Sequence, residues 1–273
     1  YKVTVTVEQL KLISVTAPKD KTLESFCKTA DDVINALPTT VAVTTENPDI
    51  TTLPCAWTCS STYDKAPGAK NTFHWKANTN GCDVNGQTAE GDVTITNRAA
   101  IQLTADAATL TTEKEYDGSN AINGTVAVNN ITGIETTDSV DVKADASYDS
   151  KAVGARTITV AYSLEGTDAW KYLPPAQQQQ AGKIKQRPVT IIGLTAVARN
   201  YVKDNCNVEL TGGTINDLVS GEKVKIDLST AKGTIVDDKV GEGKQVTVTG
   251  IDLSGDDAGN YVLSAQPTGV TVN

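Results

Sequence analysis

The feature that most constrains the fold is an internal duplication in the chain. Segment 131–142 aligns with segment 215–226 with the apolar positions in register, and segment 152–172 aligns with segment 239–261. A repeat of about 90 residues is the size of a whole small domain rather than of one solenoid turn. The sequence therefore predicts two copies of one domain, preceded by a different segment.

The residue pattern in all parts of the chain predicts β-strands. β-branched residues alternate with polar ones, as in segments 2–7 and 245–249, which is typical of a sheet with one wet face. Only 5% of the residues are aromatic, so the cores must consist mainly of aliphatic side chains. Strands punctuated by turns every 8–12 residues or so favour sandwiches. We expect an all-β fold of tandem β-sandwich domains in an elongated array.

One short helix is expected near residues 29–37. Thr29 is a suitable N-cap, Asp32 completes a capping box, and Pro38 ends the helix. Apolar residues occupy even-numbered positions before Gly250 (Val246 and Val248) and odd-numbered positions after it (Ile251 and Leu253). A regular strand would turn one of these pairs to solvent, so the switch predicts a bulge or a sharp bend at Gly250. The glutamines of segment 177–180 resemble an exposed connector.

These signals divide the chain into three expected domains, with residues 1–97, 98–186 and 187–273. Residues 1–7 resemble a strand, and residues 1–12 are interpreted as the tail strand of a preceding module. Because the chain starts without methionine inside this strand, we expect it to be a fragment of a longer protein.

The charge distribution argues against two kinds of partner. The 24 basic and 33 acidic residues give a net charge of −9 that is spread along the chain, whereas nucleic-acid binding needs a concentrated basic surface. No apolar run approaches the ~20 residues of a membrane span. We therefore expect neither nucleic-acid binding nor membrane insertion by this segment.

Four of the five cysteines, Cys27, Cys55, Cys59 and Cys82, lie in the first third of the chain. On an extended strand Cys55 and Cys59 are about 13 Å apart, too far for a mutual disulfide. Two disulfides therefore require Cys27–Cys55 with Cys59–Cys82, or Cys27–Cys59 with Cys55–Cys82; buried free thiols are the alternative. The spacing does not suit zinc, and Cys206 is expected to be a small core residue.

The carboxylates of the second copy could suggest chemistry. Asp257 aligns with Asp168, but Asp256 aligns with Thr167, so the repeat keeps one acid and not a pair. A structural turn is the favoured interpretation, and a weak calcium contact that includes Asn260 is the alternative. His74, the only histidine, alternates with aromatic residues and should face solvent. We expect no catalytic residue, no metal and no cofactor.

Trp170 is the candidate ligand contact, together with Tyr172. Trp170 stands where the other copy has Gly259, in a segment predicted to be a loop. Aromatic loop residues stack on sugars or anchor protein contacts. The alternative is that Trp170 packs against the neighbouring domain.

Short motifs in the two copies resemble a known family. Tyr116–Gly118 gives a Tyr-Asp-Gly opening, Val240–Lys244 a V-G-x-G-K segment, and Asp257–Tyr261 a D-A-G-N-Y closing segment. Over about residues 95–273 these resemble the YDG repeats of bacterial surface adhesins, although each copy keeps half of the pattern. Through segments 36–45, 53–59 and 91–97, the first domain is similar to bacterial immunoglobulin-like domains.

The resemblance implies a non-catalytic, extracellular segment of a bacterial surface protein, on the cell surface or secreted, acting as an adhesin stalk or spacer. Its partners would be the neighbouring modules of a longer chain and a surface glycan or protein. The alternative function is a carbohydrate- or protein-binding module, either independent or accessory to a secreted enzyme.

Overall fold

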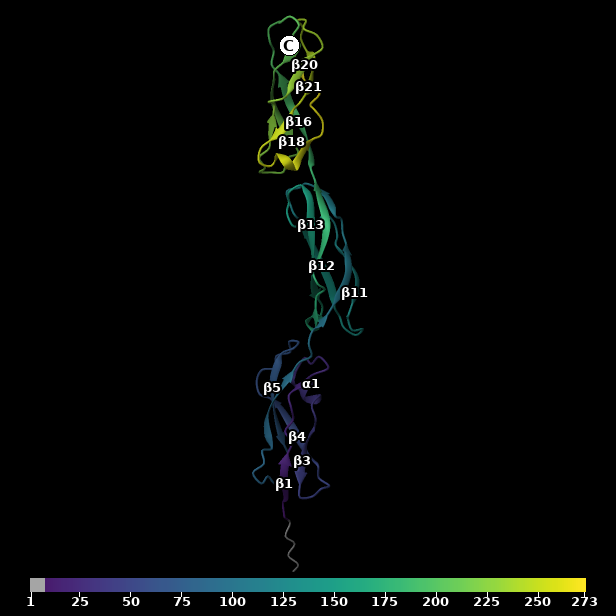
Figure 1. The fold of residues 1–273 in the computed structure, drawn as a ribbon, viewed down its shortest axis with the longest axis vertical. Helices are drawn as coiled ribbons and strands as arrows, with labels where there is room; N and C mark the ends of the chain where they lie inside the picture. Colours follow the sequence, from purple (N-terminus) through teal and green to yellow (C-terminus); the bar gives the residue numbers. More distant parts are fainter. Residues whose placement is uncertain (1–7) are drawn as a thin grey trace, which may run out of the picture. The chain divides into compact units, whose positions relative to one another are not determined.

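A computed structural model describes residues 8–273 (Figure 1). The chain divides into two compact units. The first contains residues 1–104, 131–142 and 164–175, and the second contains residues 105–130, 143–163 and 176–273. Each unit includes part of the first repeat, so this division differs from the three domains inferred from the sequence. The predicted strand at residues 1–7 lies outside the described residues.

The N-terminal part of the first unit is a seven-stranded sheet with the order β2-β7-β5-β4-β3-β1-β6. Buried residues of its five longer strands join one apolar cluster, so the sheet curls around its own core. β1 pairs antiparallel with β3 and parallel with β6. The strands are β1 (Leu10–Val15), β2 (Lys21–Thr22), β3 (Thr40–Thr45), β4 (Thr52–Cys59), β5 (Lys70–Ala77), β6 (Cys82–Asp83) and β7 (Glu90–Thr96).

The predicted helix is confirmed as α1 (Ala30–Asn35), which lies beside β4 (Figure 1). Thr29 Oγ1 accepts from the backbone N–H of Asp32 at 3.2 Å, and Asp32 accepts in return from the N–H of Thr29 at 2.9 Å. This reciprocal capping box starts the helix where the sequence predicts it. The indole of Trp57, on β4, donates to the carbonyl of Pro38 at 2.7 Å and holds the segment after the helix against the sheet.

The first repeat continues as strands. β8 and β14 pair in the first unit; β10, β15, β13 and β12 form a four-stranded sheet, and β9 and β11 form a two-stranded one. The elements are β8 (Ile101–Gln102), β9 (Thr104–Thr109), β10 (Glu113–Glu115), β11 (Ala127–Thr132), β12 (Asp141–Tyr148), β13 (Gly154–Glu165), the 3₁₀ turn η1 (Ala169–Lys171), β14 (Tyr172–Leu173) and β15 (Gln178–Lys185).

The glutamine segment is a strand, so its interpretation as an exposed connector is wrong. β15 pairs antiparallel with β13, and Gln178 and Gln180 turn their side chains toward the backbone of segment 105–108. The Gln180 amide donates to the carbonyl of Ala108 at 2.7 Å, and the Gln178 amide donates to two neighbouring carbonyls. The glutamine amides thus take the place of the backbone N–H groups that a neighbouring strand would otherwise donate to these carbonyls.

The second repeat lies wholly in the second unit. Its sheets have the orders β18-β16-β23, β17-β20-β21-β24 and β19-β22, and they enclose an aliphatic core; β16 and β18 lie side by side in Figure 1. The elements are β16 (Arg187–Ala196), β17 (Asn207–Val208), β18 (Leu210–Asn216), β19 (Lys225–Asp227), β20 (Lys232–Ile235), β21 (Lys244–Thr249), β22 (Asp252–Ser254), the 3₁₀ turn η2 (Ala258–Asn260), β23 (Tyr261–Leu263) and β24 (Thr271–Val272). The all-β fold is confirmed.

The bend predicted at Gly250 is confirmed. β21 ends at Thr249, Gly250 has φ +73°, and β22 pairs with β19 in a different sheet. The bend returns Ile251 to the buried face that Val246 and Val248 occupy. In the first repeat, where the parity does not change, β13 runs unbroken from Gly154 to Glu165.

Candidate functional site

The closing segment of the first repeat is a tight loop held by buried polar contacts. Gly166 has φ +112° and leads into η1, after which Tyr172 is buried. The Tyr172 hydroxyl donates to Asp138 Oδ2 at 2.5 Å and accepts from the backbone N–H of Glu135 at 3.1 Å. The second candidate ligand contact is therefore a structural tyrosine inside the first unit.

An ion-pair cluster surrounds this tyrosine. Lys171 Nζ lies 2.6 Å from Asp138 Oδ1 and 3.1 Å from Asp168 Oδ1, and all three side chains are largely buried. The hydrogen bond from Lys171, together with the one from Tyr172, lowers the pKa of Asp138. Asp168 Oδ2 also accepts from the backbone N–H of Ser139 at 3.1 Å, and this bond is the main cause of its lowered pKa.

Trp170 packs against a residue from the N-terminal part of the first unit. Its ring meets Phe26 edge-to-face, with centroids 5.6 Å apart and planes at 78°, and Lys65 Nζ lies 5.6 Å from its centroid. The guanidinium of Arg98 lies over Phe26 at 4.8 Å and pairs with Glu135 at 3.0 Å. The alternative interpretation of Trp170, packing against the preceding segment, is the one the structure supports.

Replacing Trp170 with alanine should lower the free energy of unfolding of the first unit by about 2 kcal/mol, because an aromatic pair and its burial are lost. Urea unfolding monitored by far-ultraviolet circular dichroism measures this loss. Leu173→Ala is the matched control, since Leu173 lies on β14, directly after the same loop, but is 49% exposed. Equal stability of the Trp170→Ala variant and the wild type would contradict the packing role.

The second repeat builds the same loop with different residues. Tyr261 donates to Glu222 Oε2 at 2.6 Å and accepts from the backbone N–H of Val219 at 3.0 Å. Asp257 Oδ2 accepts from the N–H of Lys223 at 2.8 Å, as Asp168 does from Ser139. The favoured interpretation of Asp257 as a structural turn residue is confirmed, because its carboxylate closes the loop.

The other carboxylate of this pair, Asp256, is 79% exposed and makes a 3.5 Å contact with Lys223. Within residues 8–273, no group of three or more His, Cys, Asp and Glu side chains is arranged to hold a metal ion. His74 is partly exposed, and its ring bonds Asp92 at 2.9 Å while Phe73 and Trp75 are buried, as its strand pattern predicts.

One of the differences between the two loops changes the partner of the acid. Asn260 replaces Lys171, and Glu222 instead accepts a hydrogen bond from the Tyr116 hydroxyl of the first repeat. Tyr116 is fully buried, and its ring packs edge-to-face on Tyr261 at 5.6 Å. Tyr116, Glu222 and Tyr261 all belong to the second unit. One carboxylate therefore binds both the closing tyrosine of one repeat and the opening tyrosine of the other.

The glycine of the Tyr-Asp-Gly segment is required by this contact. Gly118 has φ +79°, and a Cβ atom there would lie 2.8 Å from Cγ1 of Val219. Nearby, Lys151 Nζ lies 3.7 Å from Glu222, and the backbone N–H of Val153 donates to Asn260 at 3.3 Å. The opening segment of the first repeat is thus in direct contact with the closing loop of the second.

A buried cation that the sequence did not single out organises the opening segment. The side chain of Lys114 is 1% exposed, and its ammonium contacts Asp117 at 2.8 Å and the carbonyls of Ser119 and Ala121 at 2.9 Å each. In the second copy Arg199 binds the carbonyls of Asn200, Asn205 and Asn207. The signal was a basic residue two positions before the tyrosine in both copies.

Stability should fall at alkaline pH because of these tyrosines. Burial, followed by the hydrogen bond to Glu222, raises the pKa of Tyr261 to about 12, and the same causes raise the pKa of Tyr116. The folded state prefers the neutral phenol, so this stabilisation is complete below the unfolded pKa of about 10 and is lost as pH rises through the folded pKa.

Urea unfolding at intervals between pH 9 and pH 12 tests this dependence. Tyr261→Phe should give a flatter profile over this range than the wild type. Tyr201→Phe is the control and should keep the wild-type profile, because that side chain is 56% exposed. A wild-type profile in the Tyr261→Phe variant would refute the assignment.

The cysteines are free thiols, and neither predicted pairing is present in the described part of the chain. Burial raises the pKa of the Cys27 and Cys55 thiols. Cys55 and Cys59 lie on β4 with Trp57 between them, and Cys206 is half-buried.

No helix of residues 8–273 is long and apolar enough to cross a membrane.

Comparison with known families identifies the repeated unit. The family described as "YDG domain" matches the chain twice, at residues 96–180 and 185–269. The chain belongs to the YDG domain family. The two YDG repeats correspond to the duplication found in the sequence, and the Tyr116 contact and the closing loops described above lie within the matched residues.

Two further comparisons add little to this assignment. No curated protein matches the chain significantly. Among solved structures, the crystal structure of Drosophila N-cadherin EC1-4 is similar over 98% of this chain and 76% of its own, with 8% identity and a TM-score of 0.29. That score is too low to support an inference, so the YDG match alone carries the assignment.

Proposed function

We propose that this chain is a non-catalytic, extracellular segment of a bacterial surface protein and acts as an adhesin stalk or spacer. The observation that carries the proposal is the use of the polar side chains in the two YDG repeats. Asp168 and Asp257 close loops, and Asp138 and Glu222 bind buried tyrosines. These acids hold chain segments together, which is the task of a structural module.

A second observation supports the same proposal. The Tyr116–Glu222 bond and the Tyr116–Tyr261 ring contact link consecutive YDG repeats through side chains that are buried in the process. A spacer needs specific contacts between its modules, because two modules joined only by a flexible linker have no fixed orientation relative to each other. Neighbouring modules of a longer chain, with a surface glycan or protein at its end, are the partners that the proposal names.

The alternative, a carbohydrate- or protein-binding module, gains no support from its candidate residues. The Trp170 ring contacts Phe26 and Lys65, and Tyr172 is buried on Asp138. A sugar would have to displace these contacts before it could stack on the indole. A glycan array with the wild type and the Trp170→Ala variant distinguishes the two functions, and specific binding that Trp170→Ala abolishes would favour the binding module.

Small-angle X-ray scattering tests the spacer proposal directly. A single compact body of this length would have a radius of gyration of about 19 Å, whereas three domains in a row would give about 30 Å. The spacer proposal expects the larger value at several ionic strengths. A radius near the compact value would overturn it.

A further inference from the structure

The Tyr-Asp-Gly end of the first repeat is covered by the second repeat, and this contact defines what such an end binds. Tyr116 is 0% exposed and contacts Glu222 and Tyr261, and Gly118 fits against Val219. The backbone N–H of Tyr116 also donates to the carbonyl of Lys185 at 2.9 Å, where β15 leads into β16. The contact therefore sits where one repeat passes into the next.

The same end of the second repeat is uncovered. Tyr201 aligns with Tyr116 but is 56% exposed, and the adjacent Val202 is 50% exposed. Val240 aligns with the half-buried Val153 but is 87% exposed, and Val236 nearby is 88% exposed. An apolar cluster of this kind on one end of a domain marks an interaction site more often than chance exposure.

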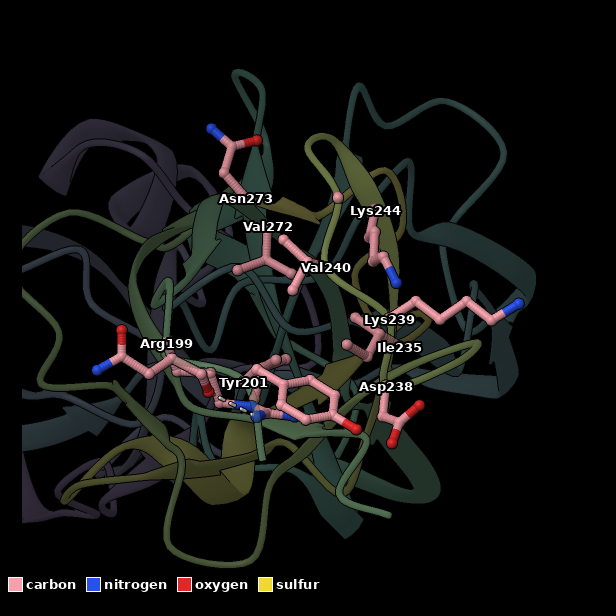
Figure 2. Close-up of a pocket in the computed structure, with 12 residues that line it drawn as sticks. Arg199, Tyr201, Ile235, Asp238, Lys239, Val240, Lys244, Val272 and Asn273 are labelled. Carbon is pink, nitrogen blue, oxygen red and sulfur yellow. Dashed lines mark hydrogen bonds between the residues drawn. The ribbon is translucent and has the colours of Figure 1, made fainter. Parts of the chain in front are cut away.

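Two of these side chains, Tyr201 and Val240, line a cavity of about 290 Å³ (Figure 2). The Tyr201 ring lies along one side, with Ile235 beside it and Val240 and Val272 above, while Lys239 extends from the rim (Figure 2). Arg199 and Lys244 also contribute to the lining. The lining combines the exposed Tyr201 ring and the exposed Val240 with three basic residues and one carboxylate, Asp238. This excess of basic groups beside an apolar surface suits a partner with an acidic group.

We infer that this cavity is the docking site for the closing loop of a further YDG repeat. In that contact Tyr201 donates to an acid at the position of Glu222, and its ring packs on a tyrosine at the position of Tyr261. The inference rests on the proposed spacer function and specifies its partner, namely another repeat of the same family.

A second copy of this chain is the less suitable occupant, because its own closing loops are already covered. Phe26 and Lys65 contact Trp170 in the closing loop of the first repeat, and Tyr116 contacts that of the second. Docking in trans would have to displace these contacts. A repeat with an uncovered loop pays no such cost, so an additional repeat is favoured.

The strand register shows where such a repeat would be joined. Lys244 on β21 pairs with Val272, and the corresponding Arg156 on β13 pairs with Gly182. Val272 is therefore equivalent to Gly182, and Asn273 to Lys183. A copy of residues 184–273 placed directly after Asn273 would reproduce the spacing between the first and second repeats.

Hydrogen–deuterium exchange on the 273-residue chain and on this extended chain tests the inference. We expect exchange in segments 197–204 and 236–243 to slow by about tenfold or more in the extended chain, because the added loop covers them. Tyr201→Ala should abolish that protection. Tyr201→Phe should retain part of it, since the ring contact persists, and segment 84–89, the connection between β6 and β7, serves as an internal control.

Equal exchange in the two chains would overturn the inference. So would a dimer of the 273-residue chain in sedimentation analysis that Tyr201→Ala abolishes, because the occupant would then be a second copy. The proposed function has its own test. A radius of gyration near the compact value would overturn the spacer function, whereas unchanged hydrogen–deuterium exchange with a large radius of gyration would overturn only the docking of a further repeat.

Discussion

Replacing Gly255 with alanine is expected to destabilise the second repeat by about 3 kcal/mol or more. Gly255 has φ +110°, and an added Cβ would lie 2.2 Å from the carbonyl oxygen of Lys223. The backbone conformation alone costs an L-residue about 1–2 kcal/mol. The remainder arises because the two backbone segments must separate, which disrupts the Asp257 bond to the same loop.

Gly243→Ala separates these two contributions. Gly243 also has a positive φ, +64°, but no atom lies within 4 Å of the place that a Cβ would take, so alanine there meets only the conformational cost. Urea denaturation of both variants gives the difference in free energy of unfolding. If both variants lose the same stability, the close approach of the backbone at Gly255 is not the cause.

The Asp138→Ala variant is expected to lose about 3 kcal/mol of stability in the first unit. Asp138 and Lys171 are 5% and 14% exposed, so truncation leaves a mostly buried ammonium with one remaining carboxylate. The Tyr172 hydroxyl loses its acceptor as well. Chemical denaturation measures the loss, and Asp256→Ala is the matched control because its carboxylate is 79% exposed and should change stability by less than about 0.5 kcal/mol.

The acid dependence of the wild type provides a further check on Asp138. Its pKa is lowered in the folded state, so its contribution is present above the unfolded pKa of about 4 and is lost as pH falls through the folded value. The Asp138→Ala variant should therefore lose less stability than the wild type between pH 5 and pH 2 or so. Parallel acid profiles would show that Asp138 is not the titrating group.

The sequence correctly predicted those elements that are determined by residues close together in the chain. The Thr29–Asp32 capping box started α1, and the parity switch at Gly250 marked the end of β21. Comparison of the copies also predicted that Asp257 serves a turn, because a paired acid was not a property of the repeat. In each case the deciding contact lies within a few residues or recurs in both copies.

Contacts between distant segments could not be predicted in the same way. The glutamines of β15 were interpreted as a connector because their partners, the carbonyls of segment 105–108, lie some 70 positions away in sequence. The bond from Tyr116 to Glu222 spans 106 positions. The buried ammonium of Lys114 was missed because charged residues on a strand are usually solvated.

The difference between Asp138 and Glu222 has a consequence for how such modules can be ordered. The shorter acid pairs with Lys171 of its own loop. The longer acid instead accepts a hydrogen bond from Tyr116 and lies near Lys151, both of which belong to the preceding repeat. Glu222 is one methylene longer than Asp138, and Asn260 replaces Lys171 in its loop. The second loop therefore depends on the preceding repeat for contacts that the first loop makes within itself. Exchanging the two modules would leave a carboxylate without its phenol at one boundary and a phenol without its carboxylate at the other, so their succession is chemically specified.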